Sequence, residues 1–212
     1  MLKTYAAADG PLRVLFVMAT EAEYGAALRT LIEPAMTGVG PVEAGLGTLQ
    51  ALHAHPADLV VNLGSAGSRT LPQAEVFQVG SVSYRDMDAS PLGFEKGVTP
   101  FLDLPAELPI PQRLPGIPAA RLATGASIVN GAAYDEIDAD MVDMETYAVF
   151  RAAALCGTAM IGLRGISDGH EPIKRFSDWT FYLAEIDAQL AGIVRALPDA
   201  FAALPKAYWT AR

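Results

Sequence analysis

Short, continuous apolar runs recur along this chain and alternate with segments of helical periodicity. The first is LRVLFVM, from Leu12 to Met18, and a later one is LVVNL, from Leu59 to Leu63. Runs of this kind are typical of strands buried on both faces, and helices between them indicate a mostly parallel sheet in an α/β fold. We expect strands at 12–18, 59–63, 77–84, 119–123 and 159–164, and helices at 21–32, 44–52, 145–155 and 179–197.

The composition fits one globular domain spanning residues 1–212. Hydrophobic residues make up 51% of the chain and charged residues 18%, which excludes a disordered protein. No apolar run is long enough for a membrane span, and the N-terminus lacks the pattern of a cleaved signal. The net charge of −9 and the lack of a basic cluster argue against a nucleic-acid partner.

Cysteine and histidine usage predicts no disulfide, no metal site and no cofactor. The only cysteine, Cys156, lies in an apolar run, so we expect a buried small hydrophobe in a reducing, cytoplasmic setting. His53 and His55 fall in a loop-like stretch before a strand, and His170 is isolated among turn residues. We therefore expect surface histidines rather than a ligand set.

Polar and glycine-rich residues collect where the expected strands end. Glu21 and Glu23 follow the first strand, the glycine-rich stretch 64–67 (GSAG) follows the second, and 164–168 (RGISD) ends a late one. Ligands bind beyond the carboxyl ends of the strands in such sheets, so these clusters predict one site. The proline-rich stretch 91–118 is expected to be a long, partly irregular excursion near the mouth of that site.

Each cluster also has a purely structural interpretation. The stretch 64–67, with Gly67 as a candidate substrate contact, could be a plain strand-to-helix turn. Thr20 and Glu23 fit a capping box, and a carboxylate at a helix start can face a cleft at the same time. Asp143 and Glu145 precede a helix, where acidic residues favour the helix dipole without any further role.

Arg164 is unusual because it interrupts an apolar strand. An unpaired arginine there would be costly, so it requires a carboxylate or a ligand as its partner. A structural ion pair and a functional contact are both open for Arg164. Ser167 and Asp168 end the same strand, where they could be ordinary loop residues.

Seven stretches occur in the order and spacing of the nucleoside phosphorylase/nucleosidase superfamily. They are FVMATEAE (16–23), TGVGPVEAGLG (37–47), VVNLGSAG (60–67), YRDMDASPLGFEKG (84–97), TGASIVNG (124–131), VDMET (142–146) and RGISD (164–168). The chain thus resembles this superfamily, most of all its branch of 5′-methylthioadenosine/S-adenosylhomocysteine nucleosidases. The resemblance implies a three-layer fold with a mixed, mostly parallel, twisted central sheet flanked by helices. It also implies a homodimer and a purine nucleoside as the small-molecule substrate.

The resemblance assigns roles on the water side and around the sugar. It implies that Glu23 is the base that positions the attacking water and that Ser65 and Arg164 help to hold that water. Met144 and Glu145 would line the ribose, with Glu145 accepting hydrogen bonds from its 2′- and 3′-hydroxyls. An anionic group there would stabilise the oxocarbenium character that develops on the sugar.

On the base side, the resemblance implies that Asp168, oriented by Ser167, faces N7 of the purine. An adenine anion leaves poorly, so N7 must be protonated or strongly hydrogen-bonded as the bond breaks. Backbone groups of Val129 would read the edge of the base. Ile128 stands where related proteins have a stacking aromatic residue, and Trp179 is a candidate to stack instead.

Two other functions stay open from the sequence. A phosphate-dependent phosphorylase would need cationic groups at a phosphate site, where this chain has Leu63 and Glu23. A nucleoside-binding homologue without turnover would explain why the segments 24–37 and 98–123 are shorter than in the family. Glu23, Glu145 and Asp168 are all present, which favours hydrolysis of the N-glycosidic bond.

Overall fold

The structure is a computed structural model that describes residues 2–211. Its strands are β1 (Leu2–Ala7), β2 (Gly10–Met18), β3 (Ala35–Met36), β4 (Leu59–Gly67), β5 (Val76–Tyr84), β6 (Glu107–Pro109), β7 (Ala119–Thr124), β8 (Met141–Asp143) and β9 (Ala159–Asp168). Its α-helices are α1 (Ala26–Arg29), α2 (Pro41–Ala54), α3 (Thr146–Leu155), α4 (Phe176–Thr180), α5 (Leu183–Ala202) and α6 (Lys206–Trp209). Short 3₁₀ helices are η1 (Glu21–Glu23), η2 (Ser90–Leu92) and η3 (Gly131–Glu136).

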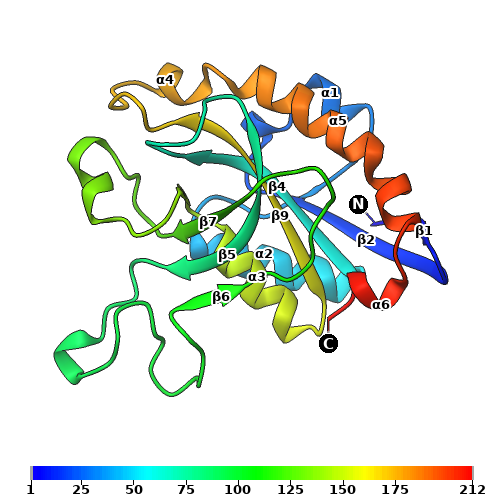
Figure 1. Ribbon diagram of the computed structural model, residues 1–212, viewed down its shortest axis with the longest axis horizontal. Coiled ribbons are helices and arrows are strands. Elements are labelled where there is room, and N and C mark those ends of the chain that lie inside the picture. The colour runs from blue at the N-terminus through cyan, green and yellow to red at the C-terminus, as the bar shows by residue number, and fades with distance from the viewer. Residues whose placement is uncertain (1, 212) are drawn as a thin grey trace.

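The nine strands of residues 2–211 form one mixed sheet with helices around it, so the predicted α/β class is confirmed (Figure 1). The pairs β2–β4, β4–β9, β5–β7 and β7–β8 are parallel, whereas β1–β2, β4–β8, β5–β6 and β5–β9 are antiparallel. Because β9 joins β4 to β5 and β8 joins β4 to β7, the sheet closes on itself. The prediction of a mostly parallel, twisted sheet was incomplete, since it included no closure.

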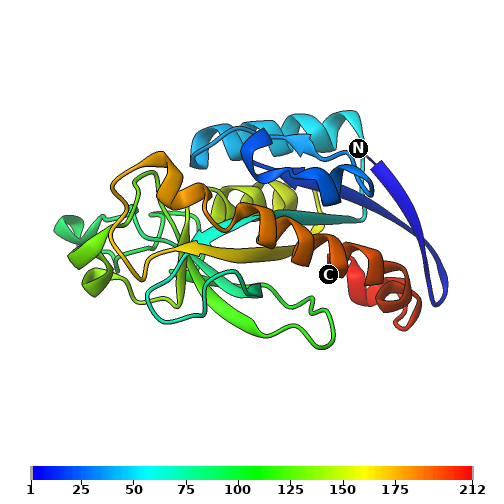
Figure 2. The ribbon, with the colours of Figure 1, turned by 90° about the horizontal axis from the view of Figure 1, so that it is seen from above.

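Two apolar clusters cover the sheet from different sides. One contains Leu190 and Val194 of α5 together with Phe16 of β2. The other contains Ala44 of α2 and Val149 of α3, packed against other strand residues. Figure 2 shows α2 in cyan and α5 in orange as separate layers. The strands are therefore buried on both faces, which explains their continuous apolar sequences.

The expected helix over 21–32 is broken into η1 and α1. Gly25 separates the two, and a Cβ at this position would stand 2.5 Å from the Asp187 carboxyl carbon. Asp187 of α5 accepts hydrogen bonds from the backbone N–H groups of Ala27 and Leu28, at 2.8 and 3.2 Å. A side chain from a distant helix thus satisfies free donors at the start of α1 and fixes the break.

Several local predictions were wrong at their boundaries. The stretch 64–67 is no turn, because it continues β4 beside β9. The expected helix over 179–197 begins earlier as α4 and restarts as α5. His53 lies in the last turn of α2 rather than in a loop, and Cys156 is exposed rather than buried. The cytoplasmic location inferred from this single cysteine stays a prediction.

The stretch 91–118 is irregular, as predicted, with only part of η2 and the short β6 inside it. Its first part forms a separate lobe at the lower left of Figure 1, whereas β6 pairs with β5 in the sheet and Leu114 packs in the core. Within the part of the chain that the structure describes, no residue of this stretch lines the cavity described below. Its expected place at the mouth of the site was therefore wrong. No helix among residues 2–211 is both long enough and apolar enough to cross a membrane.

Candidate active site

A cavity of about 800 Å³ opens where β4 and β9 end. Its lining includes every residue predicted for the site except Arg164. These lining residues are Glu23, Ser65, Gly67, Ile128, Val129, Asp143, Met144, Glu145, Ser167, Asp168 and Trp179. Stretches more than 100 residues apart thus meet at one edge of the sheet, as the carboxyl ends of neighbouring strands do.

Glu23 points into this cavity from η1, at the end of β2. Its Oε1 accepts hydrogen bonds from the Ser65 backbone N at 2.8 Å and from Ser65 Oγ at 2.6 Å. Thr20 caps η1 by accepting from the Ala22 backbone N at 3.3 Å. Thr20 is therefore the N-cap residue, as predicted. The Glu23 carboxylate bonds Ser65 across the site, whereas in a capping box it would accept from the backbone N–H of Thr20.

Burial raises the pKa of the Glu23 carboxyl above its ordinary value, and the two hydrogen bonds from Ser65 oppose that shift. A Cβ on Gly64 would stand 3.2 Å from Glu23 Oε2 and 3.5 Å from Arg164 Nη1. Glycine at this position leaves room for both charged groups against the β4 backbone. Glu23 is thus held as a partly desolvated carboxylate, the kind of group that serves as a general base.

Trp179 of α4 contacts the same serine. Its indole Nε1 donates to Ser65 Oγ at 3.1 Å, and its ring packs edge-on against Phe176 at 5.3 Å between centroids. Ser65 therefore links the tryptophan to the Glu23 carboxylate. The sequence suggested that Trp179 stacks on the base. Its hydrogen bond instead connects it to Ser65, the residue that holds the Glu23 carboxylate.

Arg164 lies beneath the cavity and is almost fully buried. Its guanidinium forms an ion pair with Asp143 at 3.1 Å and donates to Thr146 Oγ1 at 2.7 Å and to the side-chain oxygen of Asn62. The predicted carboxylate partner is therefore Asp143. The structural interpretation of Arg164 is confirmed, because all these donors are satisfied by the protein itself.

Asp143 connects this buried pair to the helix that follows. It accepts from the Thr146 backbone N at 2.9 Å, at the start of α3, and from Thr124 Oγ1 at 2.6 Å. An acidic side chain that receives a free N–H at a helix start is stabilising there. The structural role predicted for Asp143 is thus present alongside its position in the cavity lining.

Glu145 is the N-cap residue of α3 and lines the cavity next to Met144. Its Oε1 accepts from the Gly40 backbone N at 2.9 Å. Burial, followed by the nearby negative charge of Asp143, raises the pKa of Glu145 to about 7. Among residues 2–211, no group donates a hydrogen bond to the second carboxylate oxygen, so Glu145 keeps acceptor capacity for a ligand hydroxyl.

Asp168 lies at the end of β9, where Ser167 Oγ donates to its Oδ1 at 2.6 Å. Burial raises the pKa of the Asp168 carboxyl, and the hydrogen bond from Ser167 opposes this. Gly67 borders the other oxygen, because a Cβ on Gly67 would stand 2.9 Å from Asp168 Oδ2. A carboxyl group with a raised pKa keeps its proton to a higher pH than an exposed carboxyl does and can deliver that proton to a ligand.

The loop after β7 supplies the remaining predicted contacts. Val129 is buried, whereas Ile128 is 67% exposed at the cavity mouth. Arg85 fixes this loop, since its Nη1 donates to the Ala123 and Asp143 carbonyls at 3.0 and 2.9 Å, and its Nη2 donates to the Ser127 carbonyl. Sequence reasoning missed Arg85, because an arginine beside a strand end carries no pattern that distinguishes it from a surface residue.

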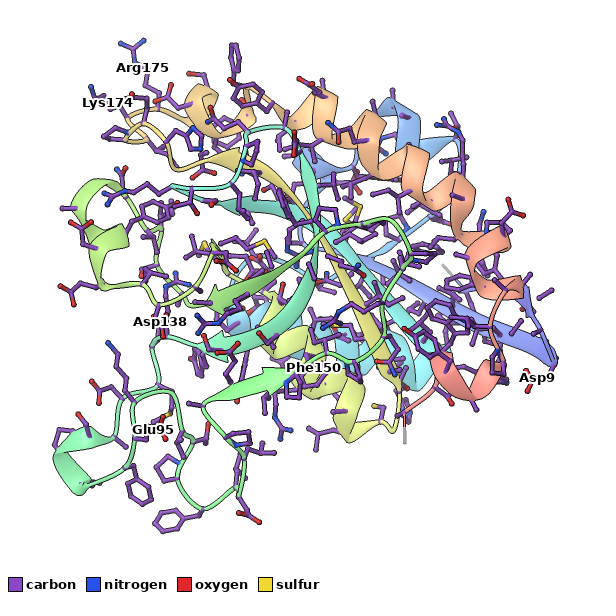
Figure 3. All side chains as sticks on the ribbon, viewed as in Figure 1. Asp9, Glu95, Asp138, Phe150, Lys174 and Arg175 are labelled. Atoms are coloured by element: carbon purple, nitrogen blue, oxygen red, sulfur yellow. The ribbon has the colours of Figure 1, made fainter. Side chains whose placement is uncertain are left out.

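Two further cations lie in the loop before α4, at the outer edge of the cavity. Lys174 and Arg175 belong to the lining, and Figure 3 shows their side chains directed outward at the tip of that loop. Another residue that sequence reasoning missed, Tyr134 of η3, lies behind the cavity wall against Gly67. The stretch 131–136 gave no helical or strand periodicity that would have drawn attention to it.

The three acids Glu23, Glu145 and Asp168 thus line one cavity. The sequence-based account required a shared cavity for Glu23 and Asp168, and the structure contains it. Cavities of several hundred Å³ with a few convergent polar groups are typical small-molecule sites. Perturbed carboxyl pKa values in such a cavity are characteristic of acid–base chemistry.

Comparison with known proteins agrees with this geometry. Residues 123–197 match the family described as the phosphorylase superfamily. The 5′-methylthioadenosine/S-adenosylhomocysteine nucleosidase of Haemophilus influenzae (strain PittEE) is 30% identical over 152 residues, which cover 63% of this chain. The matched region spans 66% of that relative, just under two thirds of its length.

Solved structures share the fold. The 5′-methylthioadenosine/S-adenosylhomocysteine nucleosidase from Neisseria meningitidis in complex with methylthio-immucillin-A superposes with a TM-score of 0.74 at 20% identity, covering 88% of this chain and 98% of that one. A futalosine hydrolase mutant of Helicobacter pylori strain 26695 gives 0.76 at 17% identity, with the same coverage of 88% and 98%.

Residues 123–197 thus match the phosphorylase superfamily, and the solved structures share the fold, so the predicted resemblance is confirmed. Among the curated relatives, the chain is similar to the 5′-methylthioadenosine/S-adenosylhomocysteine nucleosidases.

Proposed function

We propose that this protein hydrolyses the N-glycosidic bond of a purine nucleoside and releases adenine from a 5′-thio-substituted adenosine, of the methylthioadenosine or S-adenosylhomocysteine type. The observation that carries the proposal is that the carboxyl groups of Glu23 and Asp168 line one cavity of about 800 Å³ together with Glu145. Each carboxyl has its own hydrogen-bond partner and is partly desolvated, so the two are fixed before a substrate arrives.

Asp168 acts as the general acid. Its proton passes to N7 of the base while the electrons of the breaking C–N bond move into the purine ring. Burial supports this role, because it raises the pKa of Asp168 and keeps the carboxyl protonated at a higher pH than in water. Ser167 restricts the carboxyl to one orientation through Oδ1 and leaves Oδ2 for the base.

Glu23 acts as the general base on the other side of the sugar. It holds a water molecule, accepts a proton from it and directs its oxygen to the anomeric carbon. Ser65 fixes the Glu23 carboxylate by two hydrogen bonds. Arg164 contributes indirectly, since its donors are occupied by Asp143, Thr146 and neighbouring groups beneath the cavity.

Glu145 binds the ribose and stabilises the positive charge that develops on it. Its Oε1 is anchored to the Gly40 backbone, which leaves Oε2 for the sugar hydroxyls. An oxocarbenium-like transition state is stabilised by a fixed negative charge in a desolvated site. Met144 lies beside Glu145 in the lining and supplies apolar contact for the sugar ring.

The 5′ end of the nucleoside would lie at the cavity mouth, where apolar side chains gather. Val39 is 54% exposed, Ile128 67% and Phe176 72%, and all three line the cavity. A thioether is apolar and polarizable, so it gains more from such a surface than a free 5′-hydroxyl does. This supports a 5′-thio substrate over an unmodified nucleoside.

Water is favoured over phosphate as the nucleophile. A phosphate next to Glu23 would meet a carboxylate, and the adjacent guanidinium of Arg164 is already paired with Asp143. Anions in proteins require free donors or positive charge. The water side of this cavity offers a serine and a carboxylate instead.

The test is an assay of free base released from a panel of purine nucleosides, with and without phosphate. We expect adenine release from methylthioadenosine in phosphate-free buffer and near-complete loss in Asp168→Asn. Strict dependence on phosphate would make the protein a phosphorylase. Binding of adenosine analogues without any release of base would make it a non-catalytic nucleoside-binding homologue.

We also propose a homodimer in which α2 contacts the second copy. Val42 and Leu46 are 70% and 60% exposed and lie four residues apart on this helix, beside the exposed Val39. An apolar stripe of this kind on an outer helix is a typical contact surface. Light scattering after gel filtration should give twice the chain mass, and Leu46→Glu should give the monomer. A monomeric wild-type protein would exclude the dimer.

A further inference from the structure

The hydroxyl of Tyr134 is buried and has no hydrogen-bond partner among the described residues. A buried phenol without a partner costs free energy, so such a group calls for an explanation. Tyr134 lies on η3, outside the cavity lining, and none of the roles given above involves it.

The nearest functional group is the carboxyl of Asp168. A Cβ added to Gly67 would overlap Tyr134 Oη and would stand 2.9 Å from Asp168 Oδ2, so both oxygens border the same small space. Glycine at position 67 keeps that space open. Ser167 occupies Oδ1 of the carboxyl, and Oδ2 is therefore the oxygen that faces the phenol.

The segment that carries Tyr134 is tied to the end of β4. Arg69 forms an ion pair with Asp135 and donates from Nη2 to the Gly131 carbonyl at 2.6 Å. Its guanidinium also lies over the Tyr134 ring, 5.6 Å from the centroid. These contacts hold η3 against the segment that follows β4 and fix the position of the Tyr134 ring.

We propose that Tyr134 is a positioning residue for the acid: its hydroxyl donates a hydrogen bond to Asp168 Oδ2 as that oxygen gives up its proton to the base. This inference rests on the proposed function. The carboxylate formed by proton transfer would then receive two hydroxyl donors, Ser167 on Oδ1 and Tyr134 on Oδ2. A donor that gains strength as charge develops stabilises the transition state more than the ground state.

The phenol keeps its own proton in this step. Burial and the negative charge of Asp168 raise the pKa of Tyr134, whereas Arg85 and Arg69 oppose the shift only in part. Arg69, one of these two cations, is itself paired with Asp135. Tyr134 is therefore a neutral donor throughout the pH range in which an enzyme is assayed.

Tyr134→Phe removes the hydroxyl and keeps the ring. We expect kcat to fall about 10-fold while KM stays within about 2-fold, because the lost contact acts mainly on the developing charge. Activity requires protonated Asp168, so the rate falls as the pH rises through its pKa. Loss of a donor to the carboxylate raises that pKa and should move this limb of the profile about one pH unit upward.

Tyr5→Phe is the matched control. Tyr5 lies on β1, at the far side of the molecule from α4 in Figure 1, and packs against Phe16 and Phe201. The control should leave kcat, KM and the pH profile unchanged. If Tyr134→Phe also leaves all three unchanged in an enzyme that cleaves nucleosides, Tyr134 has no positioning role.

A measurement without turnover separates this inference from the proposed function. The ¹³Cγ resonance of Asp168, assigned by its absence from Asp168→Asn, reports the titration of the carboxyl directly. We expect its midpoint to rise in Tyr134→Phe and not in Tyr5→Phe, whether or not base is released. An unchanged midpoint overturns the contact between Tyr134 and Asp168, and an absence of base release overturns only the proposed reaction.

Discussion

Ser65 donates two hydrogen bonds to one oxygen of Glu23, from its backbone N at 2.8 Å and from its Oγ at 2.6 Å. The two residues come from different elements, η1 and the end of β4, and the contact fixes a carboxylate that would otherwise be mobile. Preorganised groups of this kind lose little reorganisation energy during a reaction.

Trp179→Phe should weaken the reaction by disturbing Ser65. The phenyl ring keeps most of the apolar contact but removes the indole N–H that donates to Ser65 Oγ at 3.1 Å. We expect kcat to fall about 3- to 10-fold, because a neutral hydrogen bond contributes about 0.5–1.5 kcal/mol. The same change at Trp209, whose buried Nε1 has no partner among the described residues, should leave kcat unaltered. Equal kcat values for the two variants would show that the hydrogen bond from Trp179 to Ser65 does not contribute to the reaction.

Glu145→Gln should make the ligand-free protein more stable at high pH. The carboxyl has a pKa of about 7 in the folded state, above its ordinary value of 4.5, so the folded protein holds the proton more tightly. Its contribution to stability therefore becomes unfavourable as the pH rises from about 4.5 to 7 and is fully unfavourable above that range. We expect a gain of about 1–3 kcal/mol at pH 8 and none below pH 4.5.

Urea unfolding at both pH values measures this difference. Glu95→Gln is the control, because Glu95 is exposed on the lobe at the lower left of Figure 3, away from the cavity. A gain in stability that is the same at both pH values would mean that the Glu145 charge is not the cause.

Arg164→Met should destabilise the fold strongly. The substitution leaves Asp143 buried without its cation, and breaking a buried ion pair typically costs about 3–5 kcal/mol. Arg13→Met breaks the pair between Arg13 and Asp58, in which the arginine side chain is 47% exposed, and should cost about 1 kcal/mol or less. Similar unfolding free energies for the two variants would show that the buried pair contributes little.

Much of the sheet could be predicted because its strands are buried on both faces. Each of the strands β2, β4, β5 and β9 contains a largely apolar run, and such a run can be recognised without knowing which strand it pairs with. β1 was missed because most of its residues are exposed, so it lacks an apolar pattern. Closure of the sheet was missed as well, since the pairing of β5 with β9 depends on residues nearly 90 positions apart, such as Val76 and Gly165.

The candidate site could be predicted at positions where an acidic residue type and the family resemblance both indicated the same role. Glu23, Glu145 and Asp168 are acids at strand or helix ends, and all three line the cavity. Arg85 donates hydrogen bonds to backbone carbonyls. Tyr134 lies behind the cavity wall, near the Asp168 carboxyl. Such supporting contacts arise only from tertiary packing, so no local spacing in the sequence could reveal them.

Paired acids acting on one nucleoside are the central claim, and the most direct test is the rate of base release by Glu23→Gln and Asp168→Asn. Loss of a general acid or base costs about 10²–10⁴-fold, so each variant should lose at least about 100-fold in kcat while it still binds adenosine and unfolds like the wild type. Glu21→Gln is the control, because Glu21 lies on the same turn but pairs with Arg29 at the surface. If either variant at position 23 or 168 keeps kcat within 3-fold of wild type, as Glu21→Gln should, the account is contradicted.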